Sequence, residues 1–200
     1  MMTVMTHTET GIMNEVDSLL QCLRQQTRQD HHELDHHPLL QRLLAPGLDR
    51  DSYAGILHAM YQPQWYMEAS VEAGCQQLGL DPGRLSDARS PLLARDLAAL
   101  GWPVPSSSDE AHLLTASSPG MFIGQRYVVE GARKGSIIVA RQLRQTLGSA
   151  APMSYFSHAD PEPNWREFTR QLESLLPTID RNAAITGARD MFHAFQCRLM

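Results

Sequence analysis

The 200-residue chain has few cysteines, almost no lysine and no long apolar run. Its three cysteines are far apart, odd in number and form no CxxC motif, which favours reduced thiols over a disulfide framework. No apolar stretch approaches the roughly 18 residues of a membrane span. The N-terminal segment lacks the basic and apolar regions of a signal peptide. We therefore expect a cytoplasmic protein that is not inserted in a membrane.

Acidic residues outnumber basic ones, so the net charge is −5 and the isoelectric point is near 6.0. This balance argues against a nucleic-acid partner, since such proteins usually carry a basic excess. The chain has a single lysine, Lys134, among many arginines. Its length suits one well-buried domain. We expect a mobile N-terminal tail over residues 1–13 and one domain over residues 14–200.

Apolar residues recur at helical spacing, and we find no alternating strand pattern and no internal repeat. The chain therefore reads as all-α, with six or seven helices around one core. The first helix is expected to start near Asn14 and to end before Pro38. The later helices are expected over residues 53–79 with a kink at Pro63, 92–100, 109–116, 120–147, 165–175 and 185–199.

The helix over residues 120–147 is unusual because Gly120, Gly124, Gly131 and Gly135 all lie on one of its faces. Each interior glycine costs about 1 kcal/mol relative to alanine, so the bare stripe requires a reason. One explanation is close packing against another helix. The other is a flat ligand lying against exposed backbone.

The first helix carries a histidine, His31, at a gap in its apolar stripe. The stripe consists of Val16, Leu20, Leu23, Thr27 and Leu34. His31 is therefore aimed at a core, either as a hydrogen-bonded core histidine or as a ligand. The motif HHELDHH around it is typical of a solvated helix end, where protonated imidazole suits the helix dipole. Its i,i+4 pairs also allow transition-metal binding, although no third ligand stands at a recognisable spacing.

A core-facing histidine combined with a glycine-faced helix suggests a planar cofactor between the two, and haem meets both demands. The chain resembles the haem oxygenases, and more closely the bacterial branch of iron-acquisition enzymes and forms found with bacteriophytochromes. The resemblance covers most of residues 20–195. It is carried by LRQQTRQDHHELDHHPLL, ARSPLLARDLAALG, RYVVEGARKGSIIVARQL, NWREFTRQLESL and AITGARDMFHAF, in the order of the family.

This resemblance implies a single-domain haem oxygenase-like helical fold with haem between a proximal and a distal helix. The proximal iron ligand of the family corresponds to His31, and the distal glycines correspond to Gly131 and Gly135. The positions that contact the haem propionates correspond to Arg24 and Tyr127, whose guanidinium and phenol suit carboxylates. Phe192 corresponds to an aromatic residue of the pocket, although plain core packing explains it equally well.

The implied reaction consumes haem, which is cofactor and substrate, together with O2, and yields biliverdin, CO and ferrous iron. Electrons must come from a partner such as a ferredoxin or an NAD(P)H-dependent reductase, because the sequence has no nucleotide-binding glycine loop after a strand. A bacteriophytochrome or another biliverdin acceptor is a further expected partner. Two other functions remain open: a haem-storage or haem-sensing protein, and a non-haem member of the wider superfamily that binds a metal or a small molecule.

The chain departs from the family pattern at four positions of the glycine helix. Ala132 replaces a residue that is often polar, and Ser136 replaces a second glycine. Arg133 and Lys134 replace a small or apolar pair, and are expected to face solvent and the electron donor or to turn toward a propionate. We therefore include Lys134 among the candidate cofactor-binding residues.

Overall fold

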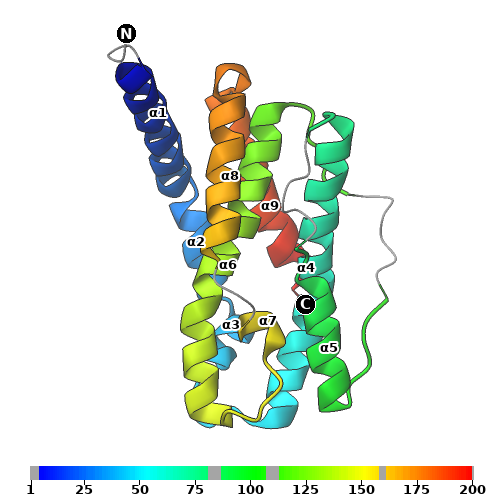
Figure 1. Cartoon of the computed structure of the whole chain (residues 1–200). Helices are drawn as coiled ribbons and strands as arrows, with labels where there is room; N and C mark the ends of the chain where they lie inside the picture. The colour runs from blue at the N-terminus through cyan, green and yellow to red at the C-terminus, as the bar shows by residue number, and fades with distance from the viewer. Residues whose placement is uncertain (1–4, 81–86, 107–112, 158–160, 200) are drawn as a thin grey trace.

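The computed structural model describes residues 5–80, 87–106, 113–157 and 161–199, and this part of the chain contains helices and no strand (Figure 1). This confirms the all-α prediction. None of the described helices is long and apolar enough to cross a membrane. The elements are α1 (Met5–Gln26), α2 (Arg28–Asp35), α3 (Pro38–Leu43), α4 (Arg50–Gln77), α5 (Ser90–Leu100), α6 (Pro119–Leu147), α7 (Ser154–Ser157), α8 (Glu162–Leu175), a 3₁₀ turn (Leu176–Thr178) and α9 (Arg181–Arg198).

The bundle is organised around α6, which runs along the whole molecule and packs most extensively against α9 (Figure 1). Helices α4 and α5 pack on one side of this pair, and α1 and α8 lie on the other. The short helices α3 and α7 lie near the end of the bundle where α6 finishes. Leucine, methionine and aromatic side chains from all the long helices form one continuous core. This arrangement leaves α2 facing the middle of α6.

Local sequence signals explain where the long helices begin and end. Asp49 caps α4 by accepting a hydrogen bond from the Ser52 amide at 2.7 Å, and Asp180 caps α9 through the Ala183 amide at 2.7 Å. The α6 helix begins with Ser118 as its cap and a proline in its first turn. Gly101 ends α5 with φ of 77°, a left-handed conformation that glycine adopts without strain.

The predictions for the first helix and for the helix over residues 109–116 differ from the structure. The first helix begins at Met5 rather than near Asn14, and it divides at Thr27 into α1 and α2. The predicted helix over residues 109–116 lies partly outside the described residues, and residues 113–116 are not helical. Pro63 lies within α4, which continues on both sides of it as expected, and the kink there stays a prediction.

The first two glycines of the stripe serve helix packing. A Cβ atom on Gly120 would lie 2.7 Å from the Asp180 carbonyl oxygen, and one on Gly124 would overlap the Ala184 carbonyl group. On the facing helix, a Cβ atom on Gly187 would overlap the backbone of Met121. The α6 and α9 backbones therefore touch directly, which confirms the packing explanation for this half of the stripe.

Candidate functional site

The second pair of glycines faces an open cleft instead of a helix. A Cβ atom added at Gly131 or Gly135 would meet nothing within 4 Å, and both residues are exposed. Two cavities of about 480 and 810 Å³ lie on this side of α6 and share His31, Val128, Gly131 and Phe192 in their walls. We call them together the α2–α6 cleft. The ligand explanation of the stripe therefore suits Gly131 and Gly135.

His31 lies on α2 across the cleft from these glycines. Its side chain is 65% exposed, so the prediction that it points into a packed core is wrong. The reason is that α2 buries none of its residues, and its inner face borders the cleft instead of protein. The Nδ1 atom lies 2.9 Å from Oδ2 of Asp35, and the ring meets the edge of Phe192 at 6.1 Å between centroids. With Nδ1 engaged, Nε2 is left as a lone-pair donor.

The larger cavity carries positive charge and a phenol at its polar end. Arg24 and Lys134 line it together with Tyr127 and Trp165. The Lys134 ammonium lies 4.0 Å from the centre of the Trp165 ring, a cation–π contact that fixes a flexible side chain. Burial raises the pKa of Tyr127, and the adjacent Arg24 guanidinium opposes that rise. This end of the cleft therefore suits carboxylate groups of a ligand.

The smaller cavity is lined mainly by apolar side chains, which suit a hydrophobic ring. Phe192 is buried on α9, and it lines both cavities, so it belongs to the cleft as well as to the core. The other apolar residues of this wall are Leu34, Leu40, Leu43, Leu44, Met60, Met67, Val128, Ile138, Val139, Phe156 and Phe195.

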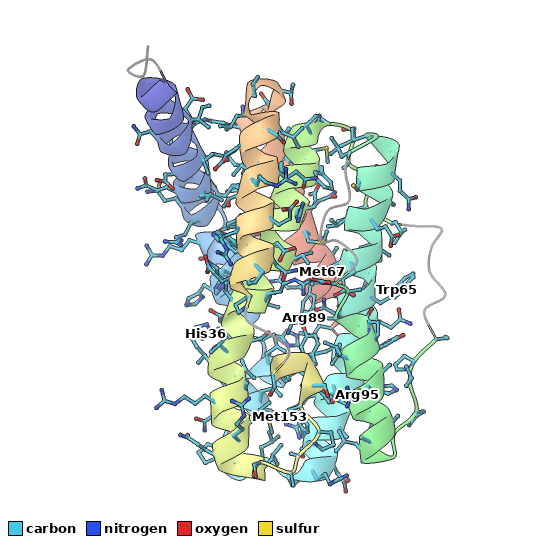
Figure 2. All side chains as sticks on the ribbon, in the orientation of Figure 1. His36, Trp65, Met67, Arg89, Arg95 and Met153 are labelled. Carbon is cyan, nitrogen blue, oxygen red and sulfur yellow. The ribbon has the colours of Figure 1, made fainter. Side chains whose placement is uncertain are left out.

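A polar cluster borders this apolar cavity next to Gly135. The Arg89 guanidinium donates to Ser136 Oγ at 2.5 Å and to the Tyr155 carbonyl at 2.8 Å, and it stacks on the Tyr155 ring. The Tyr155 hydroxyl donates to Gln64 Oε1 at 2.6 Å. Arg89 lies inside the bundle beside α7 (Figure 2). Ser136, Gln64 and Tyr155 line the cavity.

The sequence gives no signal that Arg89, Gln64 and Tyr155 form one cluster. They lie far apart in the chain, in three different segments, and each is an ordinary residue on its own. Only Ser136 gave a signal, since it departs from the family pattern. The Nη1 atom of Arg89 is buried and makes no hydrogen bond within the described protein. A buried guanidinium nitrogen of this kind normally binds an ordered water molecule.

Arg133 does not face solvent, so that expectation is wrong. Its side chain is buried, its Nε atom lies 3.0 Å from Glu130 Oε2, and its Nη2 atom donates to the Asp87 carbonyl at 2.6 Å. Burial raises the pKa of Glu130, and the Arg133 and Arg126 guanidinium groups oppose this rise. Arg133 therefore belongs to an internal charge cluster behind the cleft, whereas Lys134 is exposed and lines the cleft.

The remaining histidines of HHELDHH are engaged locally. The rings of His32 and His36 stack at 4.0 Å, and His36 Nδ1 lies 2.8 Å from the His32 carbonyl oxygen. His37 caps α3 by accepting from the Leu39 amide. Within the described part of the chain, no three His, Cys, Asp or Glu side chains are grouped as metal ligands. The cluster has the features of a solvated helix end.

Comparisons with known proteins agree with this architecture. Residues 17–199 match the family model described as "Heme oxygenase". A haem oxygenase of Xanthomonas campestris is 34% identical over 78% of this chain and 94% of its own length. The haem oxygenase PigA of Pseudomonas aeruginosa is 28% identical over 84% of this chain and 85% of its own.

Two solved structures share the fold. The haem oxygenase of Neisseria meningitidis, solved with NO and CO bound, has a TM-score of 0.66 and 20% identity, covering 90% of this chain and 89% of its own. Haem oxygenase-1 of Synechocystis sp. PCC6803, solved with haem, has a TM-score of 0.59 and 17% identity, covering 90% of both chains. The family match confirms the prediction of a haem-degrading enzyme. The chain belongs to the haem oxygenase family.

Proposed function

We propose that the α2–α6 cleft binds haem with His31 as the iron ligand on one face and the Gly131 and Gly135 backbone on the other. In this site haem is converted with O2 and external electrons into biliverdin, CO and ferrous iron. The observation that carries the proposal is the opposition of His31 and a Cβ-free surface across an open cleft. A flat ring needs both a ligand and bare backbone within reach.

The residues of the cleft fit haem in three respects. His31 would hold the haem iron through one imidazole nitrogen, while Asp35 holds the other ring nitrogen. The apolar wall suits the porphyrin, while Arg24, Lys134 and Tyr127 suit its two propionates. When bound, haem supplies both the iron that activates O2 and the carbon framework that is oxidised.

The role of Asp35 is to fix the ring of His31. Its carboxylate lies one helical turn after the histidine, at 2.9 Å from Nδ1. A carboxylate partner accepts the proton of Nδ1 in a hydrogen bond and so orients Nε2. Phe192 contacts the imidazole ring of His31 from the side of α9 and restricts the rotation of that ring.

The glycine face has no side chain that supplies an acid close to the ring. Gly131 and Gly135 offer only backbone and Ala132 adds a methyl group, while Ser136 is the polar side chain of α6 that lines the smaller cavity. Its hydroxyl donates to the Ala132 carbonyl at 3.0 Å and accepts from Arg89. Arg89 Nη1 is buried without a protein partner, and the Tyr155–Gln64 pair continues the polar surface. We infer that protons reach the cleft along the polar side chains that line it, Ser136, Tyr155 and Gln64, because residue 132 is an alanine.

The electrons come from an external donor, because the described chain is a helical domain without a nucleotide-binding strand and loop. A ferredoxin or an NAD(P)H-dependent reductase suits this role. Three further statements remain our predictions. They are a cytoplasmic location, the transfer of biliverdin to a bacteriophytochrome or another acceptor, and membership of the iron-acquisition or bacteriophytochrome branch. The division into a tail over residues 1–13 and a domain over residues 14–200 also remains a prediction, although the described part of residues 1–13 belongs to α1.

The test is hemin turnover followed by visible absorption. Purified protein with one equivalent of hemin receives ascorbate or a ferredoxin–reductase pair in air, alongside His31→Ala. Decay of the Soret band with growth of a biliverdin band in the wild type alone supports the proposal. A hemin complex that survives reduction in air contradicts it and indicates a storage or sensing protein. A chain that binds no hemin contradicts it and indicates a non-haem ligand.

A further inference from the structure

The helix that carries His31 has little packing of its own. Helix α2 spans eight residues and buries none of them. Isolated helices of this length are marginal in water, so α2 must be held by its neighbours. It is also separated from α1 by the break at Thr27, whose side chain is buried and bonded to the Leu23 carbonyl at 2.8 Å. The position of His31 therefore depends on what anchors α2.

The anchoring contacts come from α9, at three successive turns. Arg189 donates from Nε and Nη2 to the Gln26 carbonyl at 3.2 and 2.8 Å. One turn later Phe192 meets the ring of His31. After another turn Gln196 Nε2 donates to the Asp30 carbonyl at 3.3 Å. All three residues lie on the side of α9 that faces α2.

Arg189 acts at the break itself. Gln26 is the last residue of α1, and the last carbonyls of a helix lack partners within it. The guanidinium supplies two donors to this carbonyl and lies 3.9 Å from the Asp30 carboxylate in the first turn of α2. It therefore connects the end of α1 to the start of α2. A cation at a helix C-terminus also suits the helix dipole.

The other side of α9 is fixed to the distal helix. Gly120 and Gly124 of α6 and Gly187 of α9 bring the two backbones into contact, with no room for a Cβ atom. Gly187 and Arg189 are only two residues apart in α9. The same stretch of α9 thus touches the helix of Gly131 and Gly135 on one side and the helix of His31 on the other (Figure 1).

We propose that α9 sets the width of the cleft, with Arg189 and Gln196 as positioning residues that hold α2 and His31 at a fixed distance from the glycine face. This inference rests on the proposed binding of haem between α2 and α6. It predicts that loosening α9 from α2 changes ligation by His31 without disturbing the core, since Arg189 is half-exposed. Neither residue lines the two cavities of the cleft.

The test compares Arg189→Ala with a matched control on the same helix. Arg181→Ala removes an exposed arginine of α9 that donates to Ser18 of α1 at 3.2 Å, away from the break. Arg189→Lys keeps the charge but not the paired donors. Hydrogen exchange of the α2 amides is measured without hemin. The hemin Kd and the iron–histidine stretching frequency of the ferrous complex are measured with it.

We expect Arg189→Ala to raise α2 amide exchange and the hemin Kd by about tenfold each, on the scale of one charged hydrogen bond. The iron–histidine frequency should fall, Arg189→Lys should recover part of each change, and Arg181→Ala should match the wild type. Unchanged α2 exchange and Kd in Arg189→Ala, or equal effects in Arg181→Ala, would overturn the proposal. A wild type that binds no hemin would overturn the proposed function. The exchange rates without hemin would still show whether Arg189 anchors α2.

Discussion

The Nδ1 atom of His31 lies 2.9 Å from Oδ2 of Asp35, one turn further along α2. This pairing leaves Nε2 as the imidazole nitrogen that is free to bind a ligand. Carboxylate partners of metal-binding histidines commonly contribute 10- to 100-fold in metal affinity or activity. Asp35 is largely exposed, so the lower end of that range applies here.

The first prediction concerns this carboxylate. Asp35→Asn should weaken hemin binding by about tenfold and lower the iron–histidine stretching frequency, because a neutral amide oxygen accepts a weaker hydrogen bond from Nδ1 than a carboxylate does. Hemin titration and resonance Raman spectroscopy measure the two effects. Glu33→Gln, an exposed carboxylate on another face of the same helix, is the control. Equal effects of the two substitutions would show that Asp35 has no specific role.

The two halves of the glycine stripe should respond in opposite ways to the same substitution. Gly124→Ala should destabilise the chain because its Cβ overlaps the Ala184 carbonyl group. Gly135→Ala should stabilise the hemin-free chain by about 0.5–1 kcal/mol, since nothing lies near its Cβ and alanine favours helix. Thermal unfolding without hemin measures both.

In the presence of hemin the outcome at Gly135 should reverse. A larger side chain, as in Gly135→Leu, would occupy the face where the ring is proposed to lie. We expect a stable, folded protein that has lost most of its hemin affinity. Gly135→Leu protein that binds hemin as tightly as the wild type would contradict the placement of the ring against α6.

The cluster at Ser136 should affect turnover more than binding. Ser136→Ala removes one of the two acceptors of Arg89 Nη2 and leaves that nitrogen bonded to the Tyr155 carbonyl alone. We expect slower biliverdin formation with a hemin Kd within about threefold of the wild type, because the hydroxyl lies in the wall beside the ring. Ser136→Thr, which keeps the hydroxyl, should retain the rate. A Ser136→Ala enzyme with unchanged turnover would exclude this cluster from proton delivery.

The single lysine of the chain allows a chemical test of the polar end of the cleft. Lys134 carries the only side-chain amine, so an acetylating reagent that modifies amines reports on this residue and the N-terminus alone. Hemin should protect Lys134 from acetylation while leaving the N-terminus reactive. Peptide mass spectrometry measures the two sites. Equal labelling of Lys134 with and without hemin would place the propionates elsewhere.

The stability of α4 should depend on pH through its cap. Hydrogen bonds from the Ser52 amide and hydroxyl lower the pKa of Asp49 below its ordinary value of 3.8. Because the folded-state pKa is lowered, the stabilisation is complete above the ordinary value and is lost as pH falls through the folded-state pKa. The difference in Tm between the wild type and Asp49→Ala should therefore shrink on acidification. For Asp49→Asn, which caps without titrating, the difference from Asp49→Ala should stay constant with pH.

Much of the fold follows from the sequence because its helices are long, periodic and clearly capped. The α6 helix was predicted within a residue of its observed start at Pro119, and Gly101 marked the end of α5 as expected. The break at Thr27 had no such signal, because its side chain bonds within the helix and the carbonyl beside it, that of Gln26, is bonded by Arg189 of the distant α9. Contacts between residues so far apart in the chain cannot be predicted from local sequence.

The candidate site was only partly predictable for the same reason. His31, Gly131 and Gly135 lie on helix faces that periodicity identifies, and the structure brings them to one cleft. Periodicity could not show that the His31 face borders a cavity instead of a core. Nor could it show that Gly120 and Gly124 differ from Gly131 and Gly135, since α9 covers only the first pair.

The central claim is that haem lies between His31 and the glycine face of α6, and a crystal structure of the hemin complex tests it most directly. We predict iron bonded to Nε2 of His31, with Asp35 still on Nδ1 and the ring against Gly131 and Gly135. We further predict propionates that reach Arg24, Tyr127 or Lys134. Iron bonded to His32 or His36, or a ring that lies away from Gly131 and Gly135, would contradict the account.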